Sequence, residues 1–377
     1  MNIVIDARPL TSRPTGVAQY LMAAVNVWSE LSDENTFILL ANKPLHLEAS
    51  KILRCAKNIQ FYYCKPPVLL KNGLVWFIFY FPYLIKKFKA DCIWGPCGLL
   101  PPFCPPSLFK LLTVNDLVFR SMPKTMSVKT LTEYSMLAPM SIKNADLIWA
   151  VSNFTATEIN YYYPNRKSHK IIVGCGLNPL RYQHIPSVIE LSEIRDKYFI
   201  NDKTLLFIGT LEPRKNLKFL LSLMPELSVS GWRLLIVGCK GWGKSDLSSI
   251  VNSQNYPKDS VTFCDFVSDY TLQGLYRTVS FFISTSLMEG FGLPQLEAMT
   301  AGCPVIAAAN SAVIEVVGNG GVLVQGWDRE IWCSSIKNAL NNRGELVSAA
   351  SQQAICHSIE GACKEVYEII NSKTVEV

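Results

Sequence analysis

The chain has 377 residues, of which 49% are hydrophobic and 18% are charged. This length suits two or three domains, and the composition excludes a largely disordered protein. The net charge of +6 is unevenly divided: residues 1–180 hold 19 Lys and Arg against 10 Asp and Glu (+9), and the rest holds 17 against 20 (−3). A basic first half indicates an anionic partner, such as a membrane face, a nucleic acid or a phosphate-bearing molecule.

The cysteines and the N-terminal residues indicate in which compartment of the cell the protein is expected. Cys92, Cys97 and Cys104 lie close together, but they lack C-x-x-C spacing and no His-rich segment follows, so we expect no zinc site. The N-terminal residues MNIVIDARPL predict a core strand rather than a signal peptide. Free thiols and the lack of an export signal favour a cytoplasmic protein.

Short β-branched runs alternate with amphipathic segments in the first half of the chain. The predicted strand–helix pairs are 3–5 with 17–31, 109–114 with 127–142, and 147–151 with 154–161. This alternation indicates parallel sheets with helices on both faces.

The segment Leu74–Ile85 (LVWFIFYFPYLI) is almost wholly apolar and is flanked by Lys71, Lys86, Lys87 and Lys89. It is too short to span a bilayer core of about 30 Å. Its aromatic and lysine content fits a segment that lies in the lipid headgroup region of an anionic membrane. A buried helix packed on a sheet explains it equally well. Nucleic acid is not the expected partner, because no recognition motif accompanies the charge.

The alternation of predicted strands and helices is interrupted at residues 178–200 and then resumes. Strands are predicted at 205–208, 234–237, 261–263, 281–283 and 304–307, with a helix at 217–223. We therefore expect two doubly wound domains, 1–180 and 200–355, with ligands at the carboxyl ends of both sheets. A last helix within 356–377 could belong to either domain, and packs back on the first in our interpretation.

Two carboxylates frame a Gly-rich turn in the second domain. Glu289 precedes the turn after strand 281–283, and Glu297 is expected in the first turn of the helix that follows. Gly290 and Gly292 let backbone amides approach a ligand, and a helix N-terminus suits hydroxyls and anions. Carboxylates accept hydrogen bonds from vicinal diols, so this element fits a sugar at one end and a ribose at the other.

Two other strand–helix turns carry polar groups suited to phosphates. Arg214 and Lys215 follow strand 205–208 and fit a pyrophosphate, whose developing charge they would stabilise. Gly16 opens the helix after strand 3–5 and could form a third wall of the same pocket.

Together these segments resemble the retaining GT-B glycosyltransferases of glycosyltransferase family 4, typified by bacterial mannosyl- and glucosyltransferases. The carrying residues are the E-x7-E element 289–297, the turn Gly209-TLEP-Arg214-Lys215-Asn216, the Gly16 loop, and Val151-Ser152-Asn153-Phe154. The run 263–272 and the segment 315–318 are also similar to the family. The resemblance covers essentially the whole chain and is strongest from 205 to 320.

The resemblance implies roles for these residues. Glu289 would contact the transferred sugar and Glu297 the ribose, while Arg214 and Lys215 would bind the diphosphate near Gly209. Gly16 and the backbone around Phe291, Gly292 and Leu293 would close the pocket, and Val267 would lie in the base-binding loop. In the front-face mechanism proposed for such enzymes, the leaving diphosphate takes the acceptor's proton.

The chain departs from the family pattern at two places. Asn115-Asp116 stands where the family often has a His-Asp pair, and Asn115 cannot titrate, so a proton-transfer role there is in doubt. Asp265 replaces the usual Gly of the base-binding loop, which puts backbone contacts to the nucleobase in doubt.

A competing motif, Gly238–Ser245, satisfies the P-loop pattern G-x4-G-K-S. The motif lies late in the chain. The strand 281–283 downstream of it is followed by Ser284 rather than by an acidic residue that could bind Mg²⁺. No Asp-x-Asp occurs anywhere, and the Arg214-Lys215 pair can neutralise a diphosphate. We therefore expect neither a metal nor a cofactor.

The resulting hypothesis is a retaining hexosyltransferase of GT-B architecture. The expected donor is GDP-mannose, and the expected acceptor is a lipid-linked saccharide at the inner membrane face, in O-antigen or capsule-type polysaccharide synthesis. Two other functions stay open: a P-loop NTPase that uses Gly238–Ser245, and a non-catalytic module that binds a sugar nucleotide or polysaccharide on the same fold.

Overall fold

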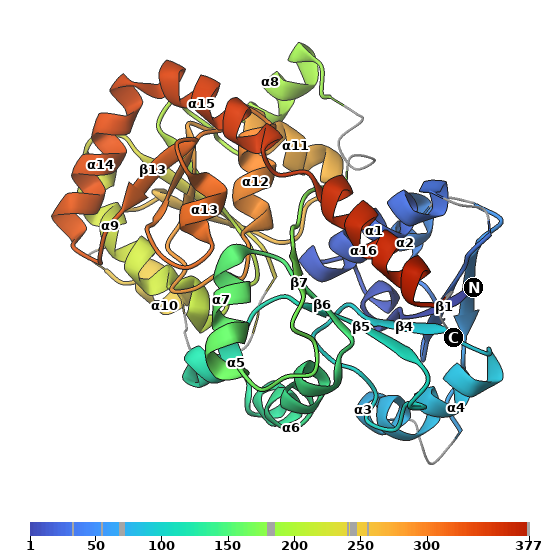
Figure 1. Ribbon diagram of the computed structural model, residues 1–377. Helices are drawn as coiled ribbons and strands as arrows, with labels where there is room; N and C mark the ends of the chain where they lie inside the picture. Colours follow the sequence, from blue (N-terminus) through green and yellow to red (C-terminus); the bar gives the residue numbers. More distant parts are fainter. Residues whose placement is uncertain are drawn as a thin grey trace. The chain divides into compact units, whose positions relative to one another are not determined.

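The computed structural model describes residues 1–31, 34–53, 56–67, 72–178, 185–239, 241, 247–254 and 256–374. It divides into two compact units: residues 1–121, 128–180 and 358–377 form the first, and residues 122–127 and 181–357 form the second. The chain thus returns to the first unit with its last helix (Figure 1). The predicted joining segment 178–200 does not stand apart from the domains, because its helix belongs to the second unit.

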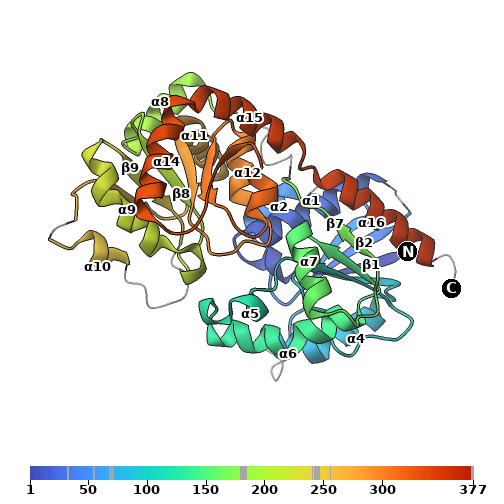
Figure 2. The same ribbon diagram turned by 60° about the vertical axis from the view of Figure 1, so that its left-hand side comes forward.

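The first unit contains a parallel sheet of seven strands in the order β3-β2-β1-β4-β5-β6-β7. Its strands are β1 (Asn2–Asp6), β2 (Thr36–Ala41), β3 (Ile59–Tyr63), β4 (Cys92–Gly95), β5 (Phe109–Val114), β6 (Leu147–Ala150) and β7 (Ile171–Val173). Its helices are η1 (Arg8–Thr11), α1 (Gly16–Leu31), α2 (Leu47–Ile52), α3 (Gly73–Val75), η3 (Trp76–Tyr80), α4 (Phe81–Lys87), α5 (Val118–Ser121), α6 (Val128–Asn144), α7 (Asn153–Tyr162) and α16 (Ile359–Thr374). Figures 1 and 2 show α1, α2 and α16 on one face of this sheet, and α4 and α6 on the other.

An aromatic core explains why α16 belongs to the first unit. Trp28 of α1 packs against Trp94 of β4 and Trp149 of β6, with ring centroids 4.7 and 6.0 Å apart. Tyr367 of α16 lies 6.5 Å from the Trp28 ring. The Trp28 indole N–H also donates to the Cys363 carbonyl at 2.9 Å. Burial of this much aromatic surface holds α16 on the sheet.

The apolar segment Leu74–Ile85 forms parts of α3, η3, a π-helical turn, and α4. Trp76 and Phe81 are fully buried, while Phe79 and Tyr83 are 60% and 56% exposed. The segment therefore packs on the unit with one side and presents aromatic rings to solvent with the other. The packed side agrees with the buried-helix interpretation, and the membrane interpretation stays a prediction.

The second unit contains a parallel sheet of six strands in the order β10-β9-β8-β11-β12-β13. Its strands are β8 (Thr204–Ile208), β9 (Arg233–Val237), β10 (Val261–Cys264), β11 (Phe281–Ser284), β12 (Val305–Ala308) and β13 (Gly321–Val324). Its helices are η4 (Pro123–Thr125), α8 (Val188–Lys197), η6 (Pro213–Lys215), α9 (Leu217–Val229), α10 (Leu247–Val251), α11 (Asp269–Thr278), α12 (Leu293–Thr300), α13 (Val313–Val317), α14 (Arg329–Asn341) and α15 (Arg343–Ile355). Helix α9 contacts α10 and α14, and α12, α13 and α15 contact one another.

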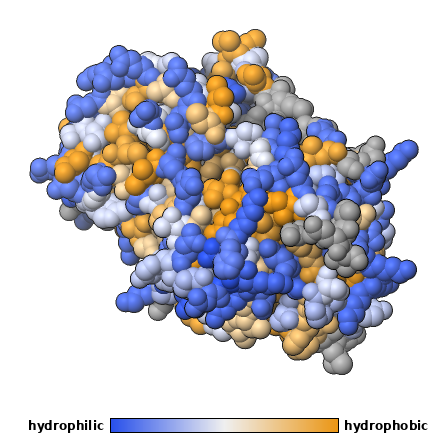
Figure 3. Space-filling model, in the orientation of Figure 1, coloured by the Kyte–Doolittle hydropathy of each residue, from blue (hydrophilic) through white to orange (hydrophobic). Residues whose placement is uncertain are grey.

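Helix α8 joins the second unit through α11, where the absence of a side chain at Gly274 makes room for Ile194. A capping box formed by Ser187 and Glu190 fixes the start of α8. Its first residues, Val188 and Ile189, remain exposed, and Figure 3 shows apolar atoms at this projecting tip.

The order of the strands defines one reversal point in each sheet. In the first sheet it lies between β1 and β4, and in the second between β8 and β11. Ligands of such sheets bind outside the carboxyl ends of the strands at this reversal. All registered strand pairs are parallel, so the loops after β8 and β11 emerge at the same edge.

Backbone packing beside this edge yields a prediction about stability. A Cβ at Gly238, directly after β9, would lie 1.9 Å from the carbonyl oxygen of Gly209. We expect Gly238→Ala to destabilise the protein by about 1–3 kcal/mol, because neither backbone can yield cheaply. Urea unfolding measures the change.

Gly361 provides the control, because a Cβ there would meet nothing within 4 Å in α16. Gly361→Ala should stabilise by about 0.5–1 kcal/mol through helix propensity. Equal stability of the wild type and Gly238→Ala would contradict the described contact.

Candidate active site of the second unit

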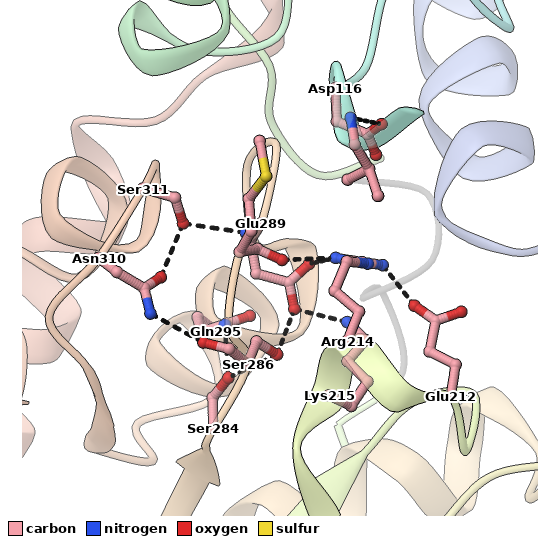
Figure 4. A network of polar contacts seen from close by, with 12 residues as sticks. Asp116, Glu212, Arg214, Lys215, Ser284, Ser286, Glu289, Gln295, Asn310 and Ser311 are labelled. Atoms are coloured by element: carbon pink, nitrogen blue, oxygen red, sulfur yellow. Dashed lines mark hydrogen bonds and ion pairs between the residues drawn. The ribbon is translucent and has the colours of Figure 1, made fainter. Parts of the chain in front are cut away.

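Three of the predicted site residues meet at the reversal of the second sheet. Arg214 and Lys215 lie in η6 after β8, and Glu289 lies in the loop after β11. Lys215 Nζ donates to Glu289 Oε1 at 2.5 Å, and Arg214 Nη1 donates to Glu289 Oε2 at 2.7 Å. Figure 4 shows the carboxylate between the two cations. The sequence thus placed the three charges correctly at one edge.

Glu289 is buried and remains ionised. Burial by itself would raise the pKa of this carboxyl, but the charges of Lys215 and Arg214, with hydrogen bonds from Lys215 and Ser286, lower it to about 2. The Ser286 hydroxyl donates to Oε1 at 2.6 Å. A carboxylate held in this state cannot serve as a general acid at neutral pH, but it can accept hydrogen bonds from hydroxyl groups.

Two further hydrogen bonds fix the position of the Arg214 guanidinium. Its Nη2 donates to Glu212 Oε1 at 2.6 Å, and its Nη1 also donates to the Met288 carbonyl at 2.7 Å. Glu212 is 5% exposed and escaped the sequence analysis. With Glu212 and Glu289 present, the two cations face two carboxylates, so an incoming diphosphate has to share or replace these partners.

Backbone contacts hold the two loops against each other. The Leu287 N–H donates to the Arg214 carbonyl at 2.8 Å, and the Thr285 hydroxyl donates to the Lys215 carbonyl at 3.0 Å. Asn216, which follows Lys215, has a left-handed backbone with φ of 52°, a conformation that Asn tolerates better than most residues. The loop after β11 thereby fixes where η6 presents its side chains.

A second layer of short polar side chains orients the Glu289 loop. The Ser311 hydroxyl accepts from the Glu289 N–H at 2.9 Å, and Asn310 Nδ2 donates to the Ser286 carbonyl at 2.9 Å. Gln295 of α12 donates to the Ser284 hydroxyl at 3.1 Å. These residues could not be predicted from the sequence, because isolated Ser, Asn and Gln carry no spacing signal.

Gly292 lies at the start of the helix, as predicted, whereas Glu297 lies outside the first helical turn. Gly292 caps α12 with φ of 112°, so a side chain would be strained there, and Leu293 begins the helix. Glu297 is the fifth residue of α12 rather than part of its first turn, because the helix starts at Leu293. The Tyr276 hydroxyl donates to Glu297 Oε2 at 2.9 Å, which fixes a buried carboxylate that the helix dipole does not stabilise.

The other predicted residues of this unit lie around the same edge. Gly209 follows β8, and a Cβ there would lie 3.6 Å from Lys215 Cε. Phe291 is buried and packs its ring edge against His357 at 5.7 Å between centroids. Val267 lies between β10 and α11 and is half-buried.

Gly16, Asn115 and Asp116 belong to the first unit. Gly16 begins α1, as predicted. Asn115 follows β5 and donates from Nδ2 to the Pro96 carbonyl at 2.9 Å, and Asp116 accepts from the Val118 N–H at 3.2 Å at the start of α5.

The P-loop pattern Gly238–Ser245 falls mostly on residue 240 and residues 242–245, which lie outside the described residues. The described Gly238 has a packing role, since its backbone lies against Gly209. In the described part of the chain, no group of His, Cys, Asp or Glu side chains could hold a metal ion.

The buried state of Glu289 leads to a prediction about pH. Its pKa in the folded protein lies below the unfolded value, so its contribution to stability is present above about pH 4.5 and is lost as the pH falls toward 2. We expect Glu289→Gln to lose about 3 kcal/mol at pH 7 and progressively less below pH 4.5.

Urea unfolding of both proteins from pH 7 down to the acid limit of folding measures this difference. Glu345→Gln, at an exposed position of α15, is the control and should track the wild type. A difference between Glu289→Gln and the wild type that stays constant below pH 4 would contradict the ion pairs.

Comparison with known proteins bears on this site. The family model "Glycosyl transferases group 1" matches residues 202–342, which contain all the residues of the charged network. The O-antigen chain mannosyltransferase B of Escherichia coli is 31% identical over 53% of this chain and 53% of its own length. The O-antigen chain mannosyltransferase RfbU of Salmonella typhimurium is 29% identical over 54% of each. The matches thus span about half the length of these curated relatives.

Solved structures match nearly the whole chain. Sucrose-phosphate synthase from Thermosynechococcus elongatus has a TM-score of 0.74 at 17% identity, over 100% of this chain and 99% of that one. WaaG, a glycosyltransferase involved in lipopolysaccharide biosynthesis, has a TM-score of 0.73 at 14% identity, over 98% and 99%. At these identities the likeness concerns the fold, which is GT-B, as the sequence predicted.

Proposed function

We propose that this GT-B chain, whose residues 202–342 form a glycosyl transferases group 1 domain, transfers a hexose from a nucleotide sugar to a saccharide acceptor. The observation that carries the proposal is the convergence of Glu289, Arg214 and Lys215 at the reversal of the second sheet. Preorganised cations at such an edge suit a leaving diphosphate.

The reaction is proposed to retain the anomeric configuration. Arg214 and Lys215 stabilise the charge that grows on the leaving diphosphate, and its oxygen takes the acceptor's proton. Glu289, with a pKa of about 2, stays ionised and accepts hydrogen bonds from the sugar hydroxyls. No acid–nucleophile pair of carboxylates is required, in contrast to glycosidases. The two cations supply the positive charge, so the proposed reaction needs no metal.

Glu297 is proposed to hold the ribose of the donor. Its carboxylate is 6% exposed and is oriented by Tyr276 from α11. The amide groups around Gly292 and Leu293 at the start of α12 lie on the same loop and suit a phosphate. These contacts would place the nucleotide along the edge from α12 to the Val267 loop.

Among donors we propose GDP-mannose. The support comes from the relatives, since the E. coli and Salmonella proteins are named as O-antigen chain mannosyltransferases. The EGFGLP and TLEPRKN segments of this chain lie within the matched domain. The corresponding place for the enzyme is the synthesis of an O-antigen or capsule-type polysaccharide.

The acceptor is proposed to be a lipid-linked saccharide, met at the inner face of the cell membrane. Phe79 of η3 stacks on Phe103, with ring centroids 6.1 Å apart, and both rings are about 60% exposed. Lys86 and Lys87, at the end of the helix α4 that follows η3, are also exposed. Aromatic rings with lysines suit the headgroup region of an anionic bilayer. None of the helices in the described ranges is long and apolar enough to cross a membrane.

Nucleotide binding tests the donor assignment. GDP should raise the melting temperature of the wild type more than UDP, ADP or ATP, because stabilisation grows with the logarithm of the ligand concentration over Kd and reaches about 2.7 kcal/mol at 100 times Kd. Lys215→Ala should lose the shift. Lys218→Ala, at an exposed position of α9, should keep it. A shift with ATP alone that survives Lys215→Ala would instead favour the Gly238–Ser245 motif.

Vesicle binding tests the membrane assignment. The wild type should sediment with phosphatidylglycerol vesicles at low salt, and the double variant Phe79→Ala/Phe103→Ala should bind at least tenfold more weakly, because two exposed rings are lost. Tyr161→Ala removes an exposed ring from α7 and should bind as the wild type does. Failure of the wild type to bind the vesicles would end this assignment.

A further inference from the structure

The loop between β13 and α14 carries an exposed aromatic ring that the proposed donor site does not use. Trp327 is 39% exposed, and residues 325–331 around it are all exposed. The loop follows β13, which lies at the end of the second sheet opposite to β10. The nucleotide is proposed to extend toward the Val267 loop after β10, so Trp327 is available for another ligand.

Trp327 belongs to a cluster of three aromatic rings. The indoles of Trp327 and Trp332 are nearly parallel, with an angle of 6° between their planes and centroids 6.0 Å apart. Phe219, in the first turn of α9, stands nearly perpendicular to both, 5.2 Å from Trp327 and 5.6 Å from Trp332. Figure 1 shows α9 and α14, which carry Phe219 and Trp332, next to each other. The buried Trp332 therefore supports one face of Trp327 and leaves the opposite face for a ligand.

Hydrogen bonds fix the backbone on both sides of Trp327. The Trp332 indole N–H donates to the Gly326 carbonyl at 3.0 Å. Gly326 has a φ of 67°, a left-handed conformation that glycine adopts more readily than other residues. Asp328 caps α14, because its Oδ1 accepts from two backbone N–H groups in the first turn of that helix, at 2.9 and 3.0 Å. The position of the Trp327 ring is thus set by residues before and after it.

Two polar groups at the ring remain available for a ligand. Within the described ranges of the chain, the Trp327 indole N–H makes no hydrogen bond, and Asp328 uses only its Oδ1. A donor on the ring and an acceptor on the next residue therefore accompany the exposed surface. A hydroxyl group matches both, because it donates one hydrogen bond and accepts others.

The charges around the ring are balanced. Asp328 and Glu330 are exposed together with Arg329, and Lys218 is exposed next to Phe219 at the start of α9. Two acidic side chains thus face two basic ones. This surface has no surplus of positive charge that would attract an anionic membrane or a nucleic acid, so a neutral ligand fits it better.

The apolar area is too small for a stable contact with a second copy of the chain. Ile331, which is 50% exposed, is the other large hydrophobic residue that this loop presents. The exposed parts of the two side chains amount to about 200 Å², whereas a standard interface takes about 800 Å² from each partner. A single sugar ring suits this area. The C–H groups on one face of a pyranose pack against the electron-rich face of an indole, and its hydroxyls meet the polar groups at the rim.

We propose that Trp327 and Asp328 form a second saccharide site, separate from the donor site, where one neutral hexose unit of the acceptor chain stacks on the indole. One hydroxyl of that hexose accepts from Trp327 Nε1, and another donates to Asp328 Oδ2. This inference rests on the proposed transfer to a saccharide acceptor, and it adds a contact with that saccharide on the second unit.

Proton–nitrogen NMR of the tryptophan indole groups of the whole chain tests the site directly. Linear α-linked mannohexaose should shift the Trp327 signal in a saturable way, and this signal is assigned by its absence from Trp327→Phe. The fully buried Trp28 indole of the first unit is the internal control and should not move. A Trp327 signal that stays in place up to the solubility limit of the sugar would overturn the proposal.

Variants separate the contributions of the ring and the carboxylate. Asp328→Ser keeps a good helix cap but removes Oδ2, so it should weaken binding about threefold to tenfold when read from the Trp327 signal. In calorimetry with the same sugar, Trp327→Ala should weaken binding about tenfold, and Trp327→Phe, which keeps a ring, should stay within about threefold of the wild type. Tyr161→Ala, which loses an exposed ring of the first unit, is the matched control and should bind as the wild type does. Equal binding by Trp327→Ala and the wild type contradicts the site.

Two further measurements identify a different occupant or a different failure. If Trp327→Ala abolished sedimentation with phosphatidylglycerol vesicles, or dissociated a dimer seen for the wild type by analytical ultracentrifugation, the ring would bind a membrane or a second copy, and the proposal would be wrong. The stabilisation by GDP should persist in Trp327→Ala. Its absence in a wild type whose Trp327 signal responds to mannohexaose would count against the donor site instead.

Discussion

A carboxyl group enclosed by protein stays ionised where cations and hydrogen-bond donors offset the cost of burial. Glu289 meets this condition chiefly through Lys215 and Arg214. The requirement joins two loops from separate parts of the chain, one after β8 and one after β11, at the reversal of the second sheet. The backbone hydrogen bond from Leu287 to Arg214 holds the same two loops together. Ser286 and Ser311 fix Glu289 through hydrogen bonds to its carboxylate and its backbone N–H. These contacts orient Arg214 and Lys215 in the absence of a ligand, which suits the diphosphate binding proposed above.

The charged residues of the site could be predicted because each follows a strand in a parallel sheet. Carboxyl ends of parallel strands share one edge, so Arg214, Lys215 and Glu289 had to lie near one another once β8 and β11 were recognised. Glu212, Ser286 and Tyr276 could not be predicted, because their part depends on side-chain direction rather than on spacing. Glu297 was expected in the first turn of α12 but is its fifth residue, because the helix starts directly after the left-handed backbone at Gly292.

The alternation of strands and helices predicted the two parallel sheets, but not every strand of the first. β2, β3, β4 and β7 lie outside the predicted pairs, because short apolar runs such as residues 36–41 do not distinguish a strand from a buried helix. The segment around α8 was predicted to join two domains, and its weakly amphipathic sequence gives no sign of the Ile194–Gly274 contact that ties it to α11. The place of α16 on the first unit likewise depends on the Trp28 and Tyr367 rings, whose pairing no local pattern encodes.

The central claim is that the Glu289 network transfers a sugar from a nucleotide with retention. The most direct measurement is proton NMR of GDP-mannose incubated with the protein, which follows both the release of GDP and the anomer of the mannose first transferred to water. The account predicts GDP together with α-mannose before mutarotation, and loss of both signals in Glu289→Gln. Release of β-mannose would contradict retention.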